Sequence, residues 1–256
     1  MKDYAKKLMD TAILAGQIML ECNAETYRVE ETMNYILSTS NFETCEAFAM
    51  ATGVFATLDD KCIDSLTEIR RVSKRETNLN RIYKVNNISR RLVLNQISLD
   101  EAYDKLQEIE ASEYSPLMQR LSVLVMCGGY SALYGGGLLE MLVASFVAIV
   151  LLFVTKLDAK LSMGNFITNV LSLIPMVLLI VLVKNTLLPN LNAEVVIVGA
   201  MMPLVPGTAI TNAIRDTLRG DYNSGVARAL EAFVTALSVA LGVAIAMILA
   251  GGAELL

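Results

Sequence analysis

This chain of 256 residues is strongly apolar, with 54% hydrophobic residues, and it carries a net charge of −5. It contains no histidine, and its four cysteines form no CxxC pair, so the commoner zinc sites and a Ser-His-Asp triad are excluded. The acidic balance and the lack of a basic stripe argue against nucleic acid as a partner. Of the charged residues, 33 lie in residues 1–115 and only 14 follow, which predicts a polar domain and then a membrane region.

The polar region, residues 1–115, has the patterns of an α+β domain. Two apolar stripes in its first helix both follow the helical period. Aromatic and β-branched residues around Gly53 predict two strands joined by a turn, and Ser98 with Glu101 forms a capping box for the last helix. The predicted elements are helices at 4–20 and 24–39, a strand–turn–strand within 42–58, a strand at 62–72, and helices at 78–94 and 98–109.

The second region, residues 116–256, is predicted to be an all-α membrane domain. Its apolar runs predict five transmembrane helices, because a span takes about 20 apolar residues. The fourth is broken at Pro203, Pro206 and Gly207, since proline removes a backbone hydrogen bond and clashes with the preceding turn. The predicted spans are 117–134, 138–155, 166–183, 195–214 and 226–250.

The lysines and arginines predict the orientation of these spans in the cell membrane. No signal-peptide pattern opens the chain, so we expect the first domain to stay in the cytoplasm. Five spans then place most loop cations inside, as the positive-inside rule requires, and place residues 251–256 outside. The lipid bilayer is therefore an expected partner.

The broken fourth segment is the first candidate site, because interrupted segments with polar residues often mark transport sites. Arginine binds carboxylates through its planar guanidinium, so Arg215 and Arg228 are candidate substrate-binding residues, together with Asn212 and Thr208. The alternative is a kinked helix followed by an interfacial turn, in which these charges only contact headgroups or each other.

Acidic side chains near the predicted membrane are candidates for proton coupling. Asp216 and Glu231 lie beside the candidate arginines in the sequence, and Glu140 lies near the start of the second span. The alternative is that Asp216 and Glu231 form structural ion pairs with Arg215 and Arg228, and that Glu140 is an interfacial carboxylate.

A third group of candidates opens the second predicted helix and consists of Glu25, Thr26, Arg28 and Glu30. A solvated helix start explains most runs of this kind. The functional alternative is that these residues close on a ligand or regulate the pore. No GxxxxGK[ST] phosphate loop occurs, so transport driven by ATP through this chain is not expected, nor is any cofactor.

Two long motifs resemble those of the threonine/serine exporter (ThrE) family, including its YjjP-like members. One is AGQIMLECNAETYRVEE at 15–31; the other runs from PLVPG at 203–207 through NAIRD at 212–216 to GDYNSGVAR at 220–228. One departure is Asn23, where family members commonly have glycine. Asparagine is the next best residue for a left-handed helix end, so the departure changes little.

The resemblance implies a cytoplasmic domain and five spans in a subunit of a secondary exporter coupled to the proton gradient. The implied substrates are threonine and serine or, for the split YjjP-like forms, dicarboxylates such as succinate. It also implies a separate small YjjB-like membrane protein as a partner, or a homo-oligomer. Two alternatives stay open: a membrane-anchored metabolite-binding sensor or regulatory subunit, and, ranked last, an intramembrane enzyme.

Overall fold

The computed structural model describes residues 1–109 and 114–251. The chain divides into two compact units, and each unit is described by itself. The first combines Met1–Glu113 with Thr208–Leu230, and the second combines Tyr114–Gly207 with Glu231–Leu256.

The first unit contains a three-stranded antiparallel sheet in the order β1-β2-β3, formed by Thr44–Met50, Gly53–Asp60 and Ile63–Arg71. In β2, Val54, Ala56 and Leu58 are buried, whereas the residues between them are half-buried. This alternation gives the sheet one face that packs on helices. The predicted strand–turn–strand around Gly53 is therefore confirmed, with Met50 paired to Gly53 across the turn.

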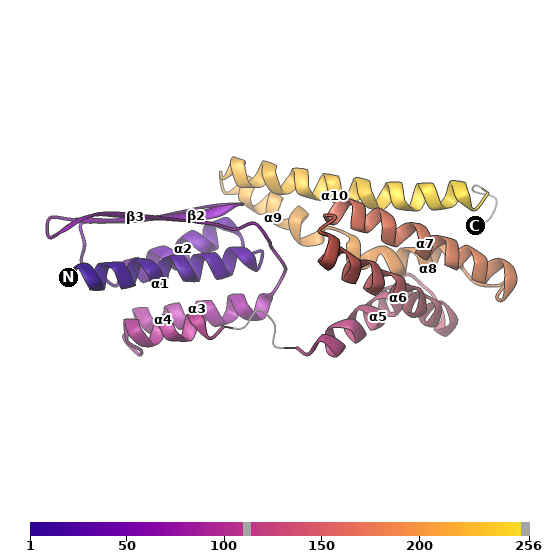
Figure 1. The fold of residues 1–256 in the computed structure, drawn as a ribbon, viewed down its shortest axis with the longest axis horizontal. Helices are drawn as coiled ribbons and strands as arrows, with labels where there is room; N and C mark the ends of the chain where they lie inside the picture. The colour runs from indigo at the N-terminus through magenta and orange to yellow at the C-terminus, as the bar shows by residue number, and fades with distance from the viewer. Residues whose placement is uncertain (110–113, 252–256) are drawn as a thin grey trace. The chain divides into compact units, whose positions relative to one another are not determined.

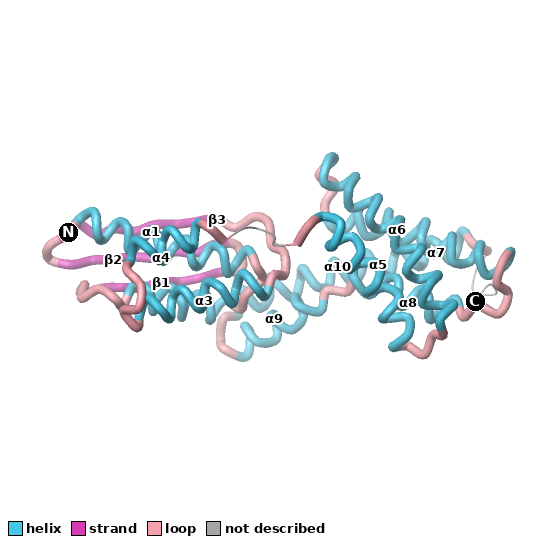
Figure 2. Tube along the Cα trace, turned by 90° about the horizontal axis from the view of Figure 1, so that it is seen from below, coloured by secondary structure: helices cyan, strands magenta, loops and turns pink. Residues whose placement is uncertain are grey.

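Four helices cover this sheet in two layers (Figures 1 and 2). Helices α1 (Lys2–Glu21) and α2 (Thr26–Leu37) lie against the strands, and α3 (Leu79–Val93) and α4 (Leu99–Gln107) pack on the far side of α1. Because α1 lies between the sheet and the outer helices, both of its apolar stripes are buried. The Ser98 hydroxyl accepts a hydrogen bond from the Glu101 N–H and begins α4, as the capping pattern predicts.

Two further segments complete the first unit, although they follow about a hundred residues later. Helix α9 (Gly207–Leu218) ends at Gly220, whose φ of +89° lies in the left-handed region that glycine favours. Asp221 then accepts a hydrogen bond from the Ser224 N–H and begins α10 (Tyr222–Leu249), whose first turns belong to this unit.

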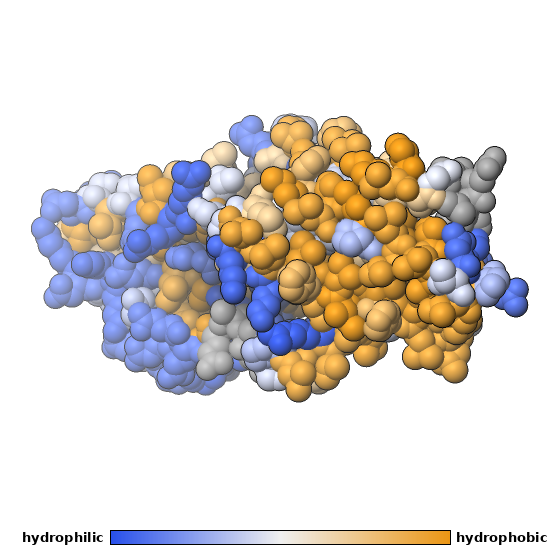
Figure 3. Space-filling model, turned by 45° about the vertical axis from the view of Figure 1, so that its right-hand side comes forward, coloured by the Kyte–Doolittle hydropathy of each residue, from blue (hydrophilic) through white to orange (hydrophobic). Residues whose placement is uncertain are grey.

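The second unit is a helical bundle formed by α5 (Pro116–Leu133), α6 (Leu138–Leu161), α7 (Asn165–Thr186), α8 (Ala193–Met201), a 3-10 turn (Met202–Leu204) and the rest of α10. Its core contains small and aliphatic side chains, with a buried hydrogen bond of 2.9 Å from Asn169 to Ser238. Large apolar side chains such as Phe146, Phe153 and Phe233 are exposed, and Figure 3 shows this apolar surface in orange. Such a surface is typical of a lipid-facing bundle.

The prediction of a separate cytoplasmic α+β domain followed by five transmembrane helices is wrong. In the described part of the chain, three helices are long and apolar enough to cross a membrane: α6, α7 and α10. A fourth span is counted only if Ala193–Leu204 and Gly207–Leu218, bent by 55° at their break, are taken together. The break itself coincides with Pro203, Pro206 and Gly207, as the prolines predict.

Two physical reasons account for the wrong count. The predicted span 117–134 forms α5, whose first turns include Gln119 and Arg120, so this helix is not among those apolar enough. Helix α9 is amphipathic and buries Asn212 and Asp216 within the first unit. The outer position predicted for residues 251–256 depended on that count, and all but the first of them lie outside the described residues.

A close approach of α8 to α5 gives a test of the second unit. A Cβ added at Gly199 would lie 2.7 Å from the Ser131 backbone nitrogen, whereas one added at Gly129 would meet nothing within 4 Å. Overpacking of this kind costs about 1–3 kcal/mol, so we expect Gly199→Ala to lower the unfolding temperature of the detergent-solubilised protein. Gly129→Ala is the matched control and should be neutral or slightly stabilising, because alanine favours helices. Equal unfolding temperatures for the two variants would contradict the packing.

Candidate functional site

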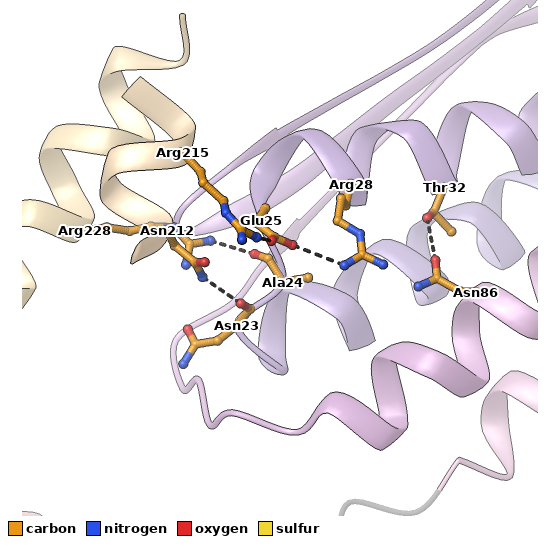
Figure 4. Close-up of polar contacts among 9 residues, drawn as sticks. All are labelled: Asn23, Ala24, Glu25, Arg28, Thr32, Asn86, Asn212, Arg215 and Arg228. Carbon is orange, nitrogen blue, oxygen red and sulfur yellow. Dashed lines mark hydrogen bonds and ion pairs between the residues drawn. The ribbon is translucent and has the colours of Figure 1, made fainter. Parts of the chain in front are cut away.

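The candidate site is built around the turn that joins α1 to α2. Asn23 has a φ of +61° in this turn, so asparagine serves where glycine is the usual residue. The Asn23 carbonyl accepts a hydrogen bond of 2.8 Å from the Asn212 side chain, and the Ala24 carbonyl accepts one of 2.8 Å from Arg228 (Figure 4). Both carbonyls belong to the turn between α1 and α2, where the backbone has no helical hydrogen-bond partners, so side chains satisfy them. The two polar motifs therefore meet in one site.

Glu25 begins α2 and connects two arginines from different parts of the sequence. Its carboxylate forms an ion pair with Arg215 of α9, and its second oxygen lies 3.5 Å from Arg28 of α2 (Figure 4). The Glu25 side chain is only 10% exposed, whereas that of Arg215 is 55% exposed. Burial opposes the charge on Glu25, but a backbone N–H and the two guanidinium groups outweigh it, so the pKa of Glu25 lies below its usual value.

Arg228 and Asp216 form a second ion pair between α10 and α9. The Arg228 Nε lies 3.0 Å from the Asp216 Oδ2, and the side chains are 1% and 0% exposed. Thr26 lies next to the same carboxylate. Charged side chains are almost never fully buried unless they are paired, so this ion pair is a candidate functional feature.

Glu30 lies one turn further along α2 and accepts a hydrogen bond of 3.0 Å from the Ala49 N–H. Burial raises the pKa of Glu30, that hydrogen bond opposes the rise, and the nearby carboxylates of Asp221 and Asp216 raise it further. The environment of Glu30 therefore shifts its equilibrium toward the protonated form relative to an exposed glutamate.

Three of the predicted site residues make other contacts than the two ion pairs above. Thr208 accepts a hydrogen bond of 3.4 Å from Thr77. Glu140 accepts hydrogen bonds from the Gly137 N–H at 2.9 Å and the Asn192 N–H at 3.2 Å, so it caps α6 and fixes the connection before α8. Glu231 belongs to the second unit, where its carbonyl accepts a hydrogen bond from Thr235.

Sequence reasoning missed two contacts of this site. The buried Ser224 hydroxyl accepts a hydrogen bond of 3.1 Å from the Ala51 N–H in the β1–β2 turn, and Arg219 lies over the Tyr27 ring at 4.1 Å. The sequence did offer one signal for such contacts: both motifs are dense in polar residues. Two separate surface turns would not need so many.

The site combines one accessible and one buried guanidinium, each paired with a protein carboxylate. Arg215 is the most accessible guanidinium of the two ion pairs, and a bidentate carboxylate could replace Glu25 as its partner. Arg228 is fully enclosed, so it holds the site together from within.

The raised pKa of Glu30 predicts a specific dependence of stability on pH. Folding raises the pKa of such an acid, so its protonated form stabilises the folded state. This stabilisation is complete when the pH is below the ordinary pKa, about 4.3, and it is lost as the pH rises through the raised pKa. Glu30→Gln mimics the protonated form, so it should raise the unfolding temperature at pH 7 by roughly 2 °C or more and have no effect near pH 4. Glu31→Gln, at an exposed neighbour, is the control. A gain at pH 4 as large as that at pH 7 would contradict the assignment.

The comparisons with known proteins agree with the two motifs. The family model described as "Putative threonine/serine exporter" (ThrE) matches residues 10–250. The chain is also 23% identical, over 98% of its own length and 96% of the relative's, to a protein of Klebsiella aerogenes named "Probable succinate transporter subunit YjjP". No solved structure matches this chain. These names indicate a membrane transporter rather than an enzyme, and a match over nearly the whole chain shows that it belongs to the threonine/serine exporter (ThrE) family.

Proposed function

We propose that this chain is one subunit of a secondary exporter that moves small carboxylate-bearing metabolites out of the cytoplasm. The substrates are threonine and serine or a dicarboxylate such as succinate, as the family description and the name of the relative suggest. The observation that carries the proposal is the Glu25–Arg215 pair, in which an accessible guanidinium already binds a carboxylate.

The proposed substrate-binding residues are Arg215, Arg228, Asn212 and Thr208. Arg215 is assigned to the substrate carboxylate because its side chain is half exposed. Arg228 and Asn212 bind the α1–α2 turn, so they position Arg215 through the packing of α9 on that turn. Thr208 precedes Asn212 by one helical turn in α9 and supplies a hydroxyl.

Proton coupling is proposed for Asp216, with Glu231 and Glu140 as further candidates. Asp216 is supported by its full burial and its ion pair with Arg228, because protonation of Asp216 would weaken that pair. Support for Glu140 is weaker, since its carboxylate holds two backbone N–H groups of the second unit.

The proposed partner is a small YjjB-like membrane protein or a second copy of this chain. The relative is named as a subunit, and the described residues offer three to four candidate spans, which is few for a complete transport path. In this proposal the three-stranded sheet and α1–α4 lie in the cytoplasm. The first motif regulates access to the site through Glu25, Thr26, Arg28 and Glu30.

Efflux from proteoliposomes tests the function. Labelled serine, threonine and succinate are loaded in parallel, a pH gradient is imposed, and the chain is reconstituted with and without its small partner. We expect efflux of at least one substrate that depends on the gradient. Absence of efflux under all conditions, with the protein folded, would contradict the proposal.

Arg215→Gln tests the site. We expect efflux to fall about tenfold or more, because a charge-assisted hydrogen bond contributes roughly 1.5–3 kcal/mol. Arg70→Gln is the matched control, since Arg70 is 55% exposed like Arg215 and also pairs with a glutamate. Arg215 is a sharper test than Arg228, whose replacement would leave a buried acid without its partner. Normal efflux in Arg215→Gln would remove it from the site.

A further inference from the structure

A second candidate binding site lies in the first unit, between α2 and α3. It is a cleft of about 500 Å³, within the size range of pockets that bind small molecules. The lining residues are Arg28, Leu79, Ile82, Tyr83, Asn86, Asn87, Arg90, Arg91 and Leu94. None of these nine is acidic, so the cleft is a positively charged feature of a chain whose net charge is negative.

The three arginines of the cleft have few acidic partners in the fold: Arg28 forms a long ion pair with Glu25, and Arg91 interacts electrostatically with Glu101 of α4. Arg90 and Arg91 lie in the last turn of α3, where the helix dipole favours cations. Within the described residues, neither Arg90 nor Arg91 forms a salt bridge. Both side chains line the cleft and are at least partly exposed. Arg28 lies in the first turn of α2, where the dipole disfavours a cation, and its contact with Glu25 is long, at 3.5 Å. An anion in the cleft would stabilise all three charges.

The rest of the lining is apolar or carries amides. Leu79, Tyr83 and Leu94 line the cleft and are 74%, 65% and 66% exposed. A bound ligand would cover part of this apolar surface. Tyr83 offers an aromatic face for stacking, and the Asn87 amide can both donate and accept hydrogen bonds. The Asn86 amide oxygen accepts a hydrogen bond of 3.3 Å from the Thr32 hydroxyl (Figure 4), so Asn86 offers its amide N–H groups to a ligand. A ligand that fits this lining joins a flat ring with polar edges to a group of several negative charges.

We propose that this cleft binds a nucleoside phosphate. Arg28, Arg90 and Arg91 would bind the phosphates, for which the guanidinium group is well suited. Tyr83 would stack on the base, and the asparagine amides would hydrogen-bond to its edge. The nucleotide is proposed as an effector, because Arg28 connects the cleft to Glu25 and Arg215.

Arg28 connects this cleft to the candidate transport site. Its guanidinium lines the cleft and contacts the Glu25 carboxylate, which also binds Arg215 (Figure 4). A phosphate bound to Arg28 would withdraw it from Glu25 and leave that carboxylate to Arg215 alone. An effect of the nucleotide on efflux rests on the proposed function, whereas binding itself does not.

Binding is measured by isothermal titration of ADP into the full-length protein in detergent without phospholipid. We expect saturable binding to one site, at least about tenfold weaker in Arg90→Gln/Arg91→Gln, since two charge-assisted contacts are lost. Arg70→Gln/Arg71→Gln removes the same charge from β3, outside the cleft, and should bind normally. Tyr83→Phe should retain binding and Tyr83→Ala should weaken it.

Three results would overturn the proposal: no binding of ADP to the folded protein, equal weakening in both double variants, or orthophosphate binding as tightly as ADP. Because titration needs no transport, these results are distinct from a failure of efflux in proteoliposomes. If ADP binds and efflux of the proposed substrates is absent, the cleft stands and the exporter proposal fails.

Discussion

A fully buried arginine holds the candidate site together. Arg228 pairs with Asp216 and also donates to the Ala24 carbonyl at the end of α1, so one guanidinium joins three segments of the chain. Burial of a charged pair is costly, and the pair is stable only when both partners are present with good geometry. The position of α9, the start of α10 and the α1–α2 turn all depend on this side chain.

This constraint explains why the broken segment is amphipathic. After Pro206 the chain begins a new helix, and its polar side chains Asn212, Arg215 and Asp216 bind groups of the first unit instead of lipid. The accessible Arg215 is thereby held by Glu25 in a geometry that a small carboxylate can reproduce. The same carboxylate contacts Arg28, so Arg28 and Glu25 connect the basic cleft to the candidate site.

Several elements of the first unit were predictable from local patterns, although the predicted division into a separate domain and five spans was wrong. Helical periodicity located α1, the capping box located the start of α4, and Gly53 marked a turn between strands. The pairing of Glu25 with Arg215 was not predictable, since the two residues are 190 positions apart and either charge has many possible partners. The span count failed because α5 begins with polar turns that make it less apolar than a span, and because the amphipathic helix α9 packs within the first unit.

The central claim is that two distant motifs form one site, and a double-mutant cycle between Glu25 and Arg215 tests it most directly. The free energies of unfolding of Glu25→Gln, Arg215→Gln and the double variant are compared with that of the unaltered protein. We predict a coupling energy of about 1 kcal/mol or more, because residues in direct contact are non-additive. Effects that add to within about 0.5 kcal/mol would contradict the claim.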